Sequence, residues 1–213
     1  MESGSMNDFF GYAVDGAGDI NGDGIDDVII SARNRVVSSA SKPEGVANVV
    51  FGNRNGFSNI SPSNPFTSSQ FFQLNGVDLA SRFGQAITGL GDFNGDGYGD
   101  FAVSAHYADS TIGPTKNVGV VYIFFGKKEH WISPINPMAI SVPNEGFRIE
   151  GTVKNDFLGV AMSLAGDVNG DGMPDLIIGV PGDSCGGIGT GDGCVYIIYG
   201  RKTRIMNLVM PAD

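Results

Sequence analysis

The stretch GDFNGDGYGD at 91–100 decides the fold, because nearly the same ten residues occur three times in the chain. The other copies are GDINGDGIDD at 18–27 and GDVNGDGMPD at 166–175. An apolar run follows each copy, as in DLIIGV at 175–180. A repeat at a regular interval indicates that each unit is one supersecondary structure packed against its neighbours. The sequence therefore predicts three related units.

Two further elements recur after the acidic stretch. The first reads NVVFG at 48–52, VVYIFFG at 120–126 and CVYIIYG at 194–200. The second occurs twice, as FFQLNG at 71–76 and FRIEG at 147–151. No segment has a helical period of ten residues or more. Each unit is thus expected to form about four short antiparallel strands.

Radial repetition of four-stranded sheets is typical of a β-propeller, so we expect an all-β chain made of three propeller blades. The alternative is a β-sandwich whose repeats are coincidental. We assign 1–8 to a tag or disordered N-terminus. The blades are assigned to 9–76, 77–151 and 152–213, and the third is expected to lack its outer strand. The apolar runs at 28–30, 101–103 and 176–178 are expected to be central strands buried on both faces.

Composition narrows the classes of function. The 213 residues include 33 Gly, 41% are hydrophobic and 17% are charged, which fits a folded chain rich in turns. The net charge of −10 argues against binding to nucleic acid or to an anionic membrane surface. No apolar stretch approaches the roughly 20 residues of a membrane span.

Oxygen-bearing side chains occupy the same places in all three acidic loops. Counting the first Asp as position 1, Asp stands at positions 1, 5 and 9, Asn at position 3 and Gly at position 6. Alternate oxygens on a tightly curled backbone converge, and position 7 adds its carbonyl oxygen. Such a set favours Ca²⁺, about three ions in all. The predicted ligands are Asp19, Asn21, Asp23, Ile25 and Asp27; Asp92, Asn94, Asp96, Tyr98 and Asp100; and Asp167, Asn169, Asp171, Met173 and Asp175.

The first six positions match the calcium loop of an EF-hand, but the remainder do not. An EF-hand needs Glu at position 12 and flanking helices, whereas position 12 here is Ile30, Val103 or Ile178. We therefore predict a calcium loop that joins two strands. The alternative is an ordinary turn, since Asp-Gly and Asn-Gly are common turn residues.

These motifs resemble those of FG-GAP repeat proteins, which form the N-terminal propeller of integrin α subunits and occur in bacterial surface proteins. The resemblance rests on the loops D-x-N-x-D-G-x-x-D and on Phe10-Gly11 and Phe83-Gly84, with Leu158-Gly159 as a departure. It implies a seven-bladed propeller, of which this chain would be a fragment. It also implies Ca²⁺ between the first two strands of each blade, and ligand contact at the opposite face.

We predict a non-catalytic binding module, because carboxylates that chelate Ca²⁺ are poor general bases. The expected partner is an extracellular protein or glycan, in integrin-like adhesion or surface recognition. The expected location is extracellular or at the cell surface. The alternatives are an accessory propeller of a secreted hydrolase, such as glycosylphosphatidylinositol phospholipase D, and a structural spacer.

The remaining candidates carry weaker signals. Cys185 and Cys194 form either a short-loop disulfide or two reduced thiols. His106 and His130 are expected to be partly exposed loop residues, and Trp131 is expected to pack over a blade edge. Asn59-Ile60-Ser61 fits a glycosylation sequon.

Three blades cannot close a ring, so we expect apolar flanks on the first and third blades. These flanks are expected to drive self-association. The rival arrangement is an open monomer whose tail at 204–210 folds back over the exposed flank.

Overall fold

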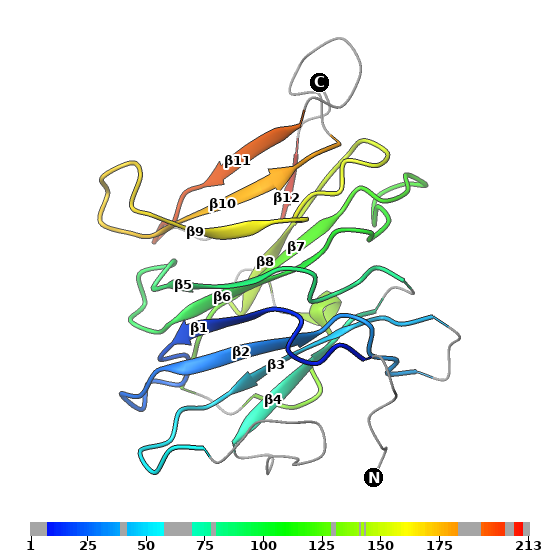
Figure 1. Ribbon diagram of the computed structural model, residues 1–213. Coiled ribbons are helices and arrows are strands. Elements are labelled where there is room, and N and C mark those ends of the chain that lie inside the picture. Colours follow the sequence, from blue (N-terminus) through cyan, green and yellow to red (C-terminus); the bar gives the residue numbers. More distant parts are fainter. Residues whose placement is uncertain are drawn as a thin grey trace.

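The chain forms three twisted antiparallel sheets that stand side by side (Figure 1). The computed structural model describes residues 8–38, 42–57, 70–77, 80–128, 131–140, 142, 144–182, 193–202 and 207–210. The all-β prediction is confirmed, and the arrangement is that of consecutive blades of a partial propeller. We call the three sheets blades 1, 2 and 3.

Within each blade, consecutive strands are neighbours. Blade 1 contains β1 (Val14–Gly18), β2 (Asp27–Ala32), β3 (Val46–Val50) and β4 (Phe71–Asn75). Blade 2 contains β5 (Ile87–Gly91), β6 (Asp100–Ala105), β7 (Val120–Phe124) and β8 (Gly146–Glu150). Among the described residues, blade 3 has only β9 (Met162–Gly166), β10 (Asp175–Val180) and β11 (Cys194–Ile198).

The outer strands of blades 1 and 2, β4 and β8, each pair with a segment that comes later in the chain. The short strand β12 (Leu208–Val209) follows blade 3 but pairs in parallel with β8 of blade 2. Ile135 follows β7 and bridges in parallel to Leu74 of β4, just before the short 3-10 helix η1 (Pro137–Ala139). The described part of the tail, residues 207–210, therefore lies along the outer edge of blade 2 and not over the open flank of blade 3.

Apolar cores fill the two spaces between blades. One joins Ala47 and Val49 of blade 1 to Phe101, Val103 and other residues of blade 2. The second joins blade 2 to blade 3, where Val121, Ile123 and Phe125 pack against residues that include Leu176 and Ile178. The alternation along β7 thus presents one side to blade 1 and the other to blade 3.

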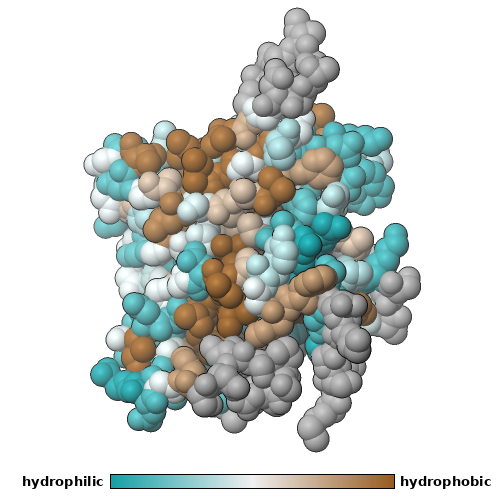
Figure 2. All heavy atoms as spheres, in the orientation of Figure 1, coloured by the Kyte–Doolittle hydropathy of each residue, from teal (hydrophilic) through white to brown (hydrophobic). Residues whose placement is uncertain are grey.

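The open side of blade 3 departs from this pattern. Val195, Ile197 and Tyr199 correspond to the buried Val121, Ile123 and Phe125, yet they are 60%, 42% and 49% exposed. In Figure 2, apolar side chains come to the surface over blade 3. The run at 101–103 is buried as predicted, but Ile177 of β10 is only half-buried because it lies on this open side. The prediction of burial on both faces is therefore wrong for β10, and also for Val28 of β2, which is half-buried.

Blade 1 does not present a matching open flank. Val46 and Val50 of β3 point away from blade 2, yet both are buried, as is Ile30 of β2. Exposed apolar side chains on this blade, such as Val14, lie on β1 and the turn before it. The expectation of two equivalent apolar flanks is thus wrong, because β3 of blade 1 is buried whereas the equivalent strand of blade 3 is exposed on its open side.

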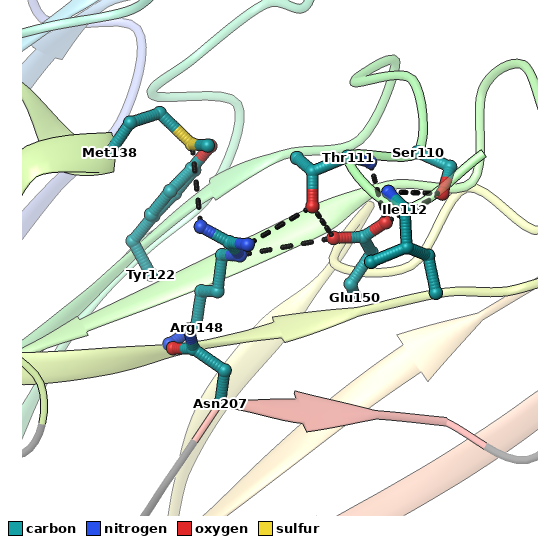
Figure 3. Close-up of polar contacts among 8 residues, drawn as sticks. All are labelled: Ser110, Thr111, Ile112, Tyr122, Met138, Arg148, Glu150 and Asn207. Carbon is teal, nitrogen blue, oxygen red and sulfur yellow. Dashed lines mark hydrogen bonds and ion pairs between the residues drawn. The ribbon is translucent and has the colours of Figure 1, made fainter. Parts of the chain in front are cut away.

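A buried carboxylate ties a long connection to the edge of blade 2 (Figure 3). Glu150 of β8 accepts hydrogen bonds from the hydroxyl groups of Ser110 (2.7 Å) and Thr111 (2.6 Å) and from the Thr111 amide (2.7 Å). Arg148 lies 3.8 Å from the same carboxylate, and its backbone amide donates to Asn207 beside β12. This network holds the connection between β6 and β7 and the C-terminal tail against one strand.

Within the described part of the chain, no helix is long and apolar enough to cross a membrane.

Candidate metal centre

The carboxylate at position 1 organises each acidic loop. In the first loop, Asp19 accepts hydrogen bonds from the backbone amides of Gly22 (2.7 Å), Asp23 (3.0 Å) and Gly24 (2.8 Å). Asp167 accepts the same three bonds in the third loop, at 2.7, 3.1 and 2.8 Å. Asp92 accepts from Asp96 (2.8 Å) and Gly97 (2.9 Å) in the second. Several N–H donors stabilise the charged form of a carboxylate and fix its position.

Positions 3 and 5 continue the same curl. The Asn side-chain oxygen accepts the position-5 amide at 2.9, 3.0 and 2.8 Å in the three loops. The position-5 carboxylate accepts the position-7 amide at 2.9, 3.0 and 2.9 Å. The position-6 glycines Gly24, Gly97 and Gly172 have φ of +81°, +95° and +88°, which favours glycine. The near-identical geometry shows that the three loops are copies of one local structure.

Position 9 is buried and joins the loop to the sheet. Asp27 accepts from the amides of Ile20 (2.9 Å) and Gly52 (2.7 Å). Asp175 accepts in the same way from Val168 (2.9 Å) and Gly200 (3.0 Å). Each carboxylate therefore links the start of its loop to the glycine that follows the third strand of the same blade.

Two of the position-9 carboxylates, Asp100 and Asp27, have a raised pKa, and the rise is larger for Asp100 of the middle loop. Asp100 accepts from Phe93, Asn94 and Gly126 at 2.8, 3.1 and 2.9 Å. Burial raises the pKa of Asp100 to about 8 and that of Asp27 to about 6, and in both the amide hydrogen bonds oppose the rise. A cation nearby would favour the charged form of both groups.

The donor set fits a hard cation. Among the described residues, no three His, Cys, Asp or Glu side chains lie close enough to hold an ion by themselves. An ion in these loops would therefore also need the Asn oxygen and the backbone carbonyl of position 7. All of these groups would bind through oxygen atoms, which are the ligands that Ca²⁺ prefers. The carboxylates of positions 1 and 5 lie in the same turn.

Each loop brings its predicted side chains at positions 1, 3 and 5 together. Position 7 contributes backbone only, and its side chain packs over the glycine after the third strand, as Ile25 does over Gly52. These glycines, Gly52, Gly126 and Gly200, were not among the site residues predicted from the sequence. Their signal is the glycine that ends each of the runs NVVFG, VVYIFFG and CVYIIYG.

The other candidates are structural. Trp131 is buried and stacks on Phe72 at 4.9 Å, as predicted. His106 is also buried, against Tyr107 at 4.3 Å, so the prediction of a partly exposed loop residue is wrong. Cys194 is disulfide-bonded. Cys185, His130 and Asn59 lie outside the described residues.

Comparison with known proteins identifies the repeat. The profile of the FG-GAP repeat family matches residues 10–41, 83–124 and 159–198, one match in each blade. The chain belongs to the FG-GAP repeat family. Each match contains one acidic loop and the second strand of its blade.

Integrin α subunits are among the relatives. Integrin alpha-PS2 of Drosophila melanogaster is 35% identical over 181 residues, which are 82% of this chain and 12% of that protein. Integrin alpha-IIb of Mus musculus is 33% identical over 185 residues, 84% of this chain and 15% of that protein. Phosphatidylinositol-glycan-specific phospholipase D of Dictyostelium discoideum is 32% identical over 211 residues, 96% of this chain and 21% of that protein. The chain thus spans a small part of the length of these relatives.

Proposed function

We propose that this FG-GAP chain is a calcium-binding propeller module that recognises an extracellular protein or glycan. The observation that carries the proposal is the threefold recurrence of one loop geometry in which the position-1 carboxylate is held by two or three backbone amides. The side chains of positions 1, 3 and 5 all supply oxygen atoms in one turn, and oxygen atoms are the ligands that Ca²⁺ prefers.

Two observations support an extracellular setting and a binding role. The disulfide at Cys194 is of a kind that persists in oxidising compartments. The similarity to integrin α subunits covers more than four-fifths of this chain. The proposed role is therefore integrin-like adhesion or surface recognition.

The second candidate is a non-catalytic accessory propeller of a secreted hydrolase. The similarity to a phosphatidylinositol-glycan-specific phospholipase D favours it, because that match extends over nearly the whole chain. Both candidates predict that the isolated chain does not hydrolyse phosphatidylinositol-glycan. Turnover that survives repurification and Ca²⁺ removal would contradict both.

Calcium binding is tested by thermal unfolding and by counting bound ions with native mass spectrometry. Because Ca²⁺ binds the folded loops and not the unfolded chain, a Ca²⁺ concentration about 100 times Kd stabilises the fold by about 2.7 kcal/mol per site. We expect three ions in the wild type and two in Asp96→Ala or Asp171→Ala. Asp26→Ala is the matched control, because Asp26 is exposed at position 8 and should leave three ions. A melting curve that is the same in chelator and in Ca²⁺ would show that the loops are only turns.

A further inference from the structure

The loops of blades 1 and 2 are joined by a hydrogen bond between their backbones. The Gly99 amide, at position 8 of the second loop, donates to the carbonyl oxygen of Asp19, the first ligand of the first loop, at 2.8 Å. Gly99 fits tightly here, since a Cβ on it would stand 2.8 Å from the carbonyl oxygen of Ala17. The Tyr98 ring lies over Gly22 of the first loop, where a Cβ would stand 2.6 Å from it. The two loops are therefore in direct contact at residues that belong to the proposed sites.

This hydrogen bond is part of a continuous relay. The Gly99 N–H belongs to the same planar peptide group as the Tyr98 carbonyl, the position-7 ligand of the second loop, so the orientation of one fixes that of the other. The accepting Asp19 carbonyl belongs to the same peptide group as the Ile20 N–H, which donates to Asp27 at 2.9 Å. The relay thus runs from position 7 of the second loop to position 9 of the first.

Between the second and third loops, the same relay is broken. The residue equivalent to Gly99 is Pro174, which has no N–H to donate to the Asp92 carbonyl. The downstream bond survives, because Phe93 donates to Asp100 at 2.8 Å. A second backbone hydrogen bond between neighbouring blades is the same in both pairs: the Lys127 amide donates to the Ile20 carbonyl at 2.9 Å, and the Arg201 amide donates to the Phe93 carbonyl at 3.0 Å. The backbone hydrogen bonds of the two loop pairs therefore differ at position 8, and the position-4 glycine faces Tyr98 in the first pair but Lys202 in the second.

We propose that this peptide relay couples the calcium sites of the first and second loops positively, and that Pro174 leaves the third site independent. The inference rests on the proposed calcium binding. Ligation at the Tyr98 carbonyl fixes the Gly99 peptide plane and strengthens its N–H as a donor. The Asp19–Ile20 peptide is then held in the orientation in which Ile20 donates to Asp27. The first loop therefore loses less conformational entropy when it binds its ion. Repulsion between bound cations opposes coupling in both pairs, and the second pair therefore serves as an internal control.

The experiment is a Ca²⁺ titration of the full chain followed by ¹H–¹⁵N spectroscopy. Gly24, Gly97 and Gly172 report on the three loops separately, because each amide donates to the position-1 carboxylate of its own loop at 2.8, 2.9 and 2.8 Å. Asp23→Ala, Asp96→Ala and Asp171→Ala each disable one loop. Every variant removes one position-5 carboxylate, so the change in charge is the same in all three.

We expect Asp96→Ala to lower the affinity of the first loop at least about fivefold, within the usual range of allosteric coupling. Reciprocity requires Asp23→Ala to lower the affinity of the second loop by the same factor. Asp171→Ala should change the affinity of the second loop less than about twofold, because the coupling there lacks the relay. Equal coupling in the two pairs, with three ions bound, would overturn the relay and leave the proposed function intact. A wild type that binds no Ca²⁺ would overturn both.

Gly99→Pro gives the second loop the position-8 residue of the third. It should keep three ions and reduce the coupling of the first pair to that of the second. Gly99→Ala is the control, because it adds a Cβ and retains the N–H. If Gly99→Ala keeps the residue-99 amide protected from hydrogen exchange and still loses the coupling, contact and not the hydrogen bond carries it, which would also overturn the relay. If Gly99→Pro does not fold, the comparison of the two loop pairs still decides.

Discussion

His106 illustrates how a single residue depends on its neighbours in space. It follows β6 and lies buried between Tyr107 and Phe157, at 4.3 and 6.4 Å. Its Nδ1 has no hydrogen-bond partner among the described residues. Burial, together with the nearby Arg82 and Arg33 guanidinium groups, lowers the pKa of His106 to about 4. The imidazole is therefore neutral in the folded protein over most of the pH range.

This pKa predicts a stability change in acid. The unfolded imidazole takes up its proton near pH 6.5 and the folded one near pH 4, so below pH 6.5 the unfolded state binds more protons. Stability should therefore fall as the pH is lowered from about 6.5 to about 4, by up to about 3 kcal/mol at 1.36 kcal/mol per pKa unit. His106→Gln should lack this contribution. Urea unfolding of both proteins across this range gives the difference, and parallel curves would show that His106 titrates normally.

Among the strands, β8 contacts the most separate parts of blade 2 and the tail. It closes blade 2, pairs with β12, and provides Glu150 to the connection between β6 and β7 (Figure 3). The equivalent strand β4 of blade 1 has the parallel bridge to Ile135 instead of a longer pairing. Edge strands need such cover, because their unpaired amides and carbonyls otherwise invite pairing with other chains.

Glu150→Ala should destabilise the chain by about 2–4 kcal/mol, because it removes the charged acceptor of three hydrogen bonds from Ser110 and Thr111. Ser110→Ala removes one donor only and should cost about 1 kcal/mol. Amide hydrogen exchange should rise selectively in 110–112 and 207–210 in Glu150→Ala. If exchange rises evenly over the whole chain, the network does not have the local role described here.

In the whole molecule, equivalent side chains have different surroundings. Ile123 of blade 2 is fully buried beneath blade 3, whereas Ile197 of blade 3 is 42% exposed. An unpaired charge at a buried site is far more costly than at the surface. Position in the series of blades, and not residue type, sets the cost of substitution.

Ile123→Asp should therefore destabilise the protein by about 4 kcal/mol or more and prevent stable folding, whereas Ile197→Asp should change stability by about 0.5 kcal/mol. Chemical unfolding measures both. A large loss in Ile197→Asp at a concentration where the chain is monomeric would show that its open side is covered.

The open side of blade 3 also predicts self-association. It continues the pattern of the two internal interfaces, while β3 of blade 1 is buried, so two copies should meet through Val195, Ile197 and Tyr199 of each. Light scattering should show a mass that rises with concentration in the wild type and less in Ile197→Asp. A monomer mass maintained at high concentration would contradict the association.

The sequence by itself determined the three units, their main strands and the pattern of oxygen-bearing side chains in each loop. These features are local: turn chemistry and strand alternation depend on residues a few positions apart. Tertiary structure alone decided the burial of His106, the half-exposure of Ile177, the pairing of β12 with β8 and the contact of Gly99 with Asp19. Each depends on residues that are distant in sequence and brought together by blade packing. For this reason the exchange of Gly99 for Pro174, which in the sequence looks like ordinary variation at position 8, becomes meaningful only when two loops lie side by side.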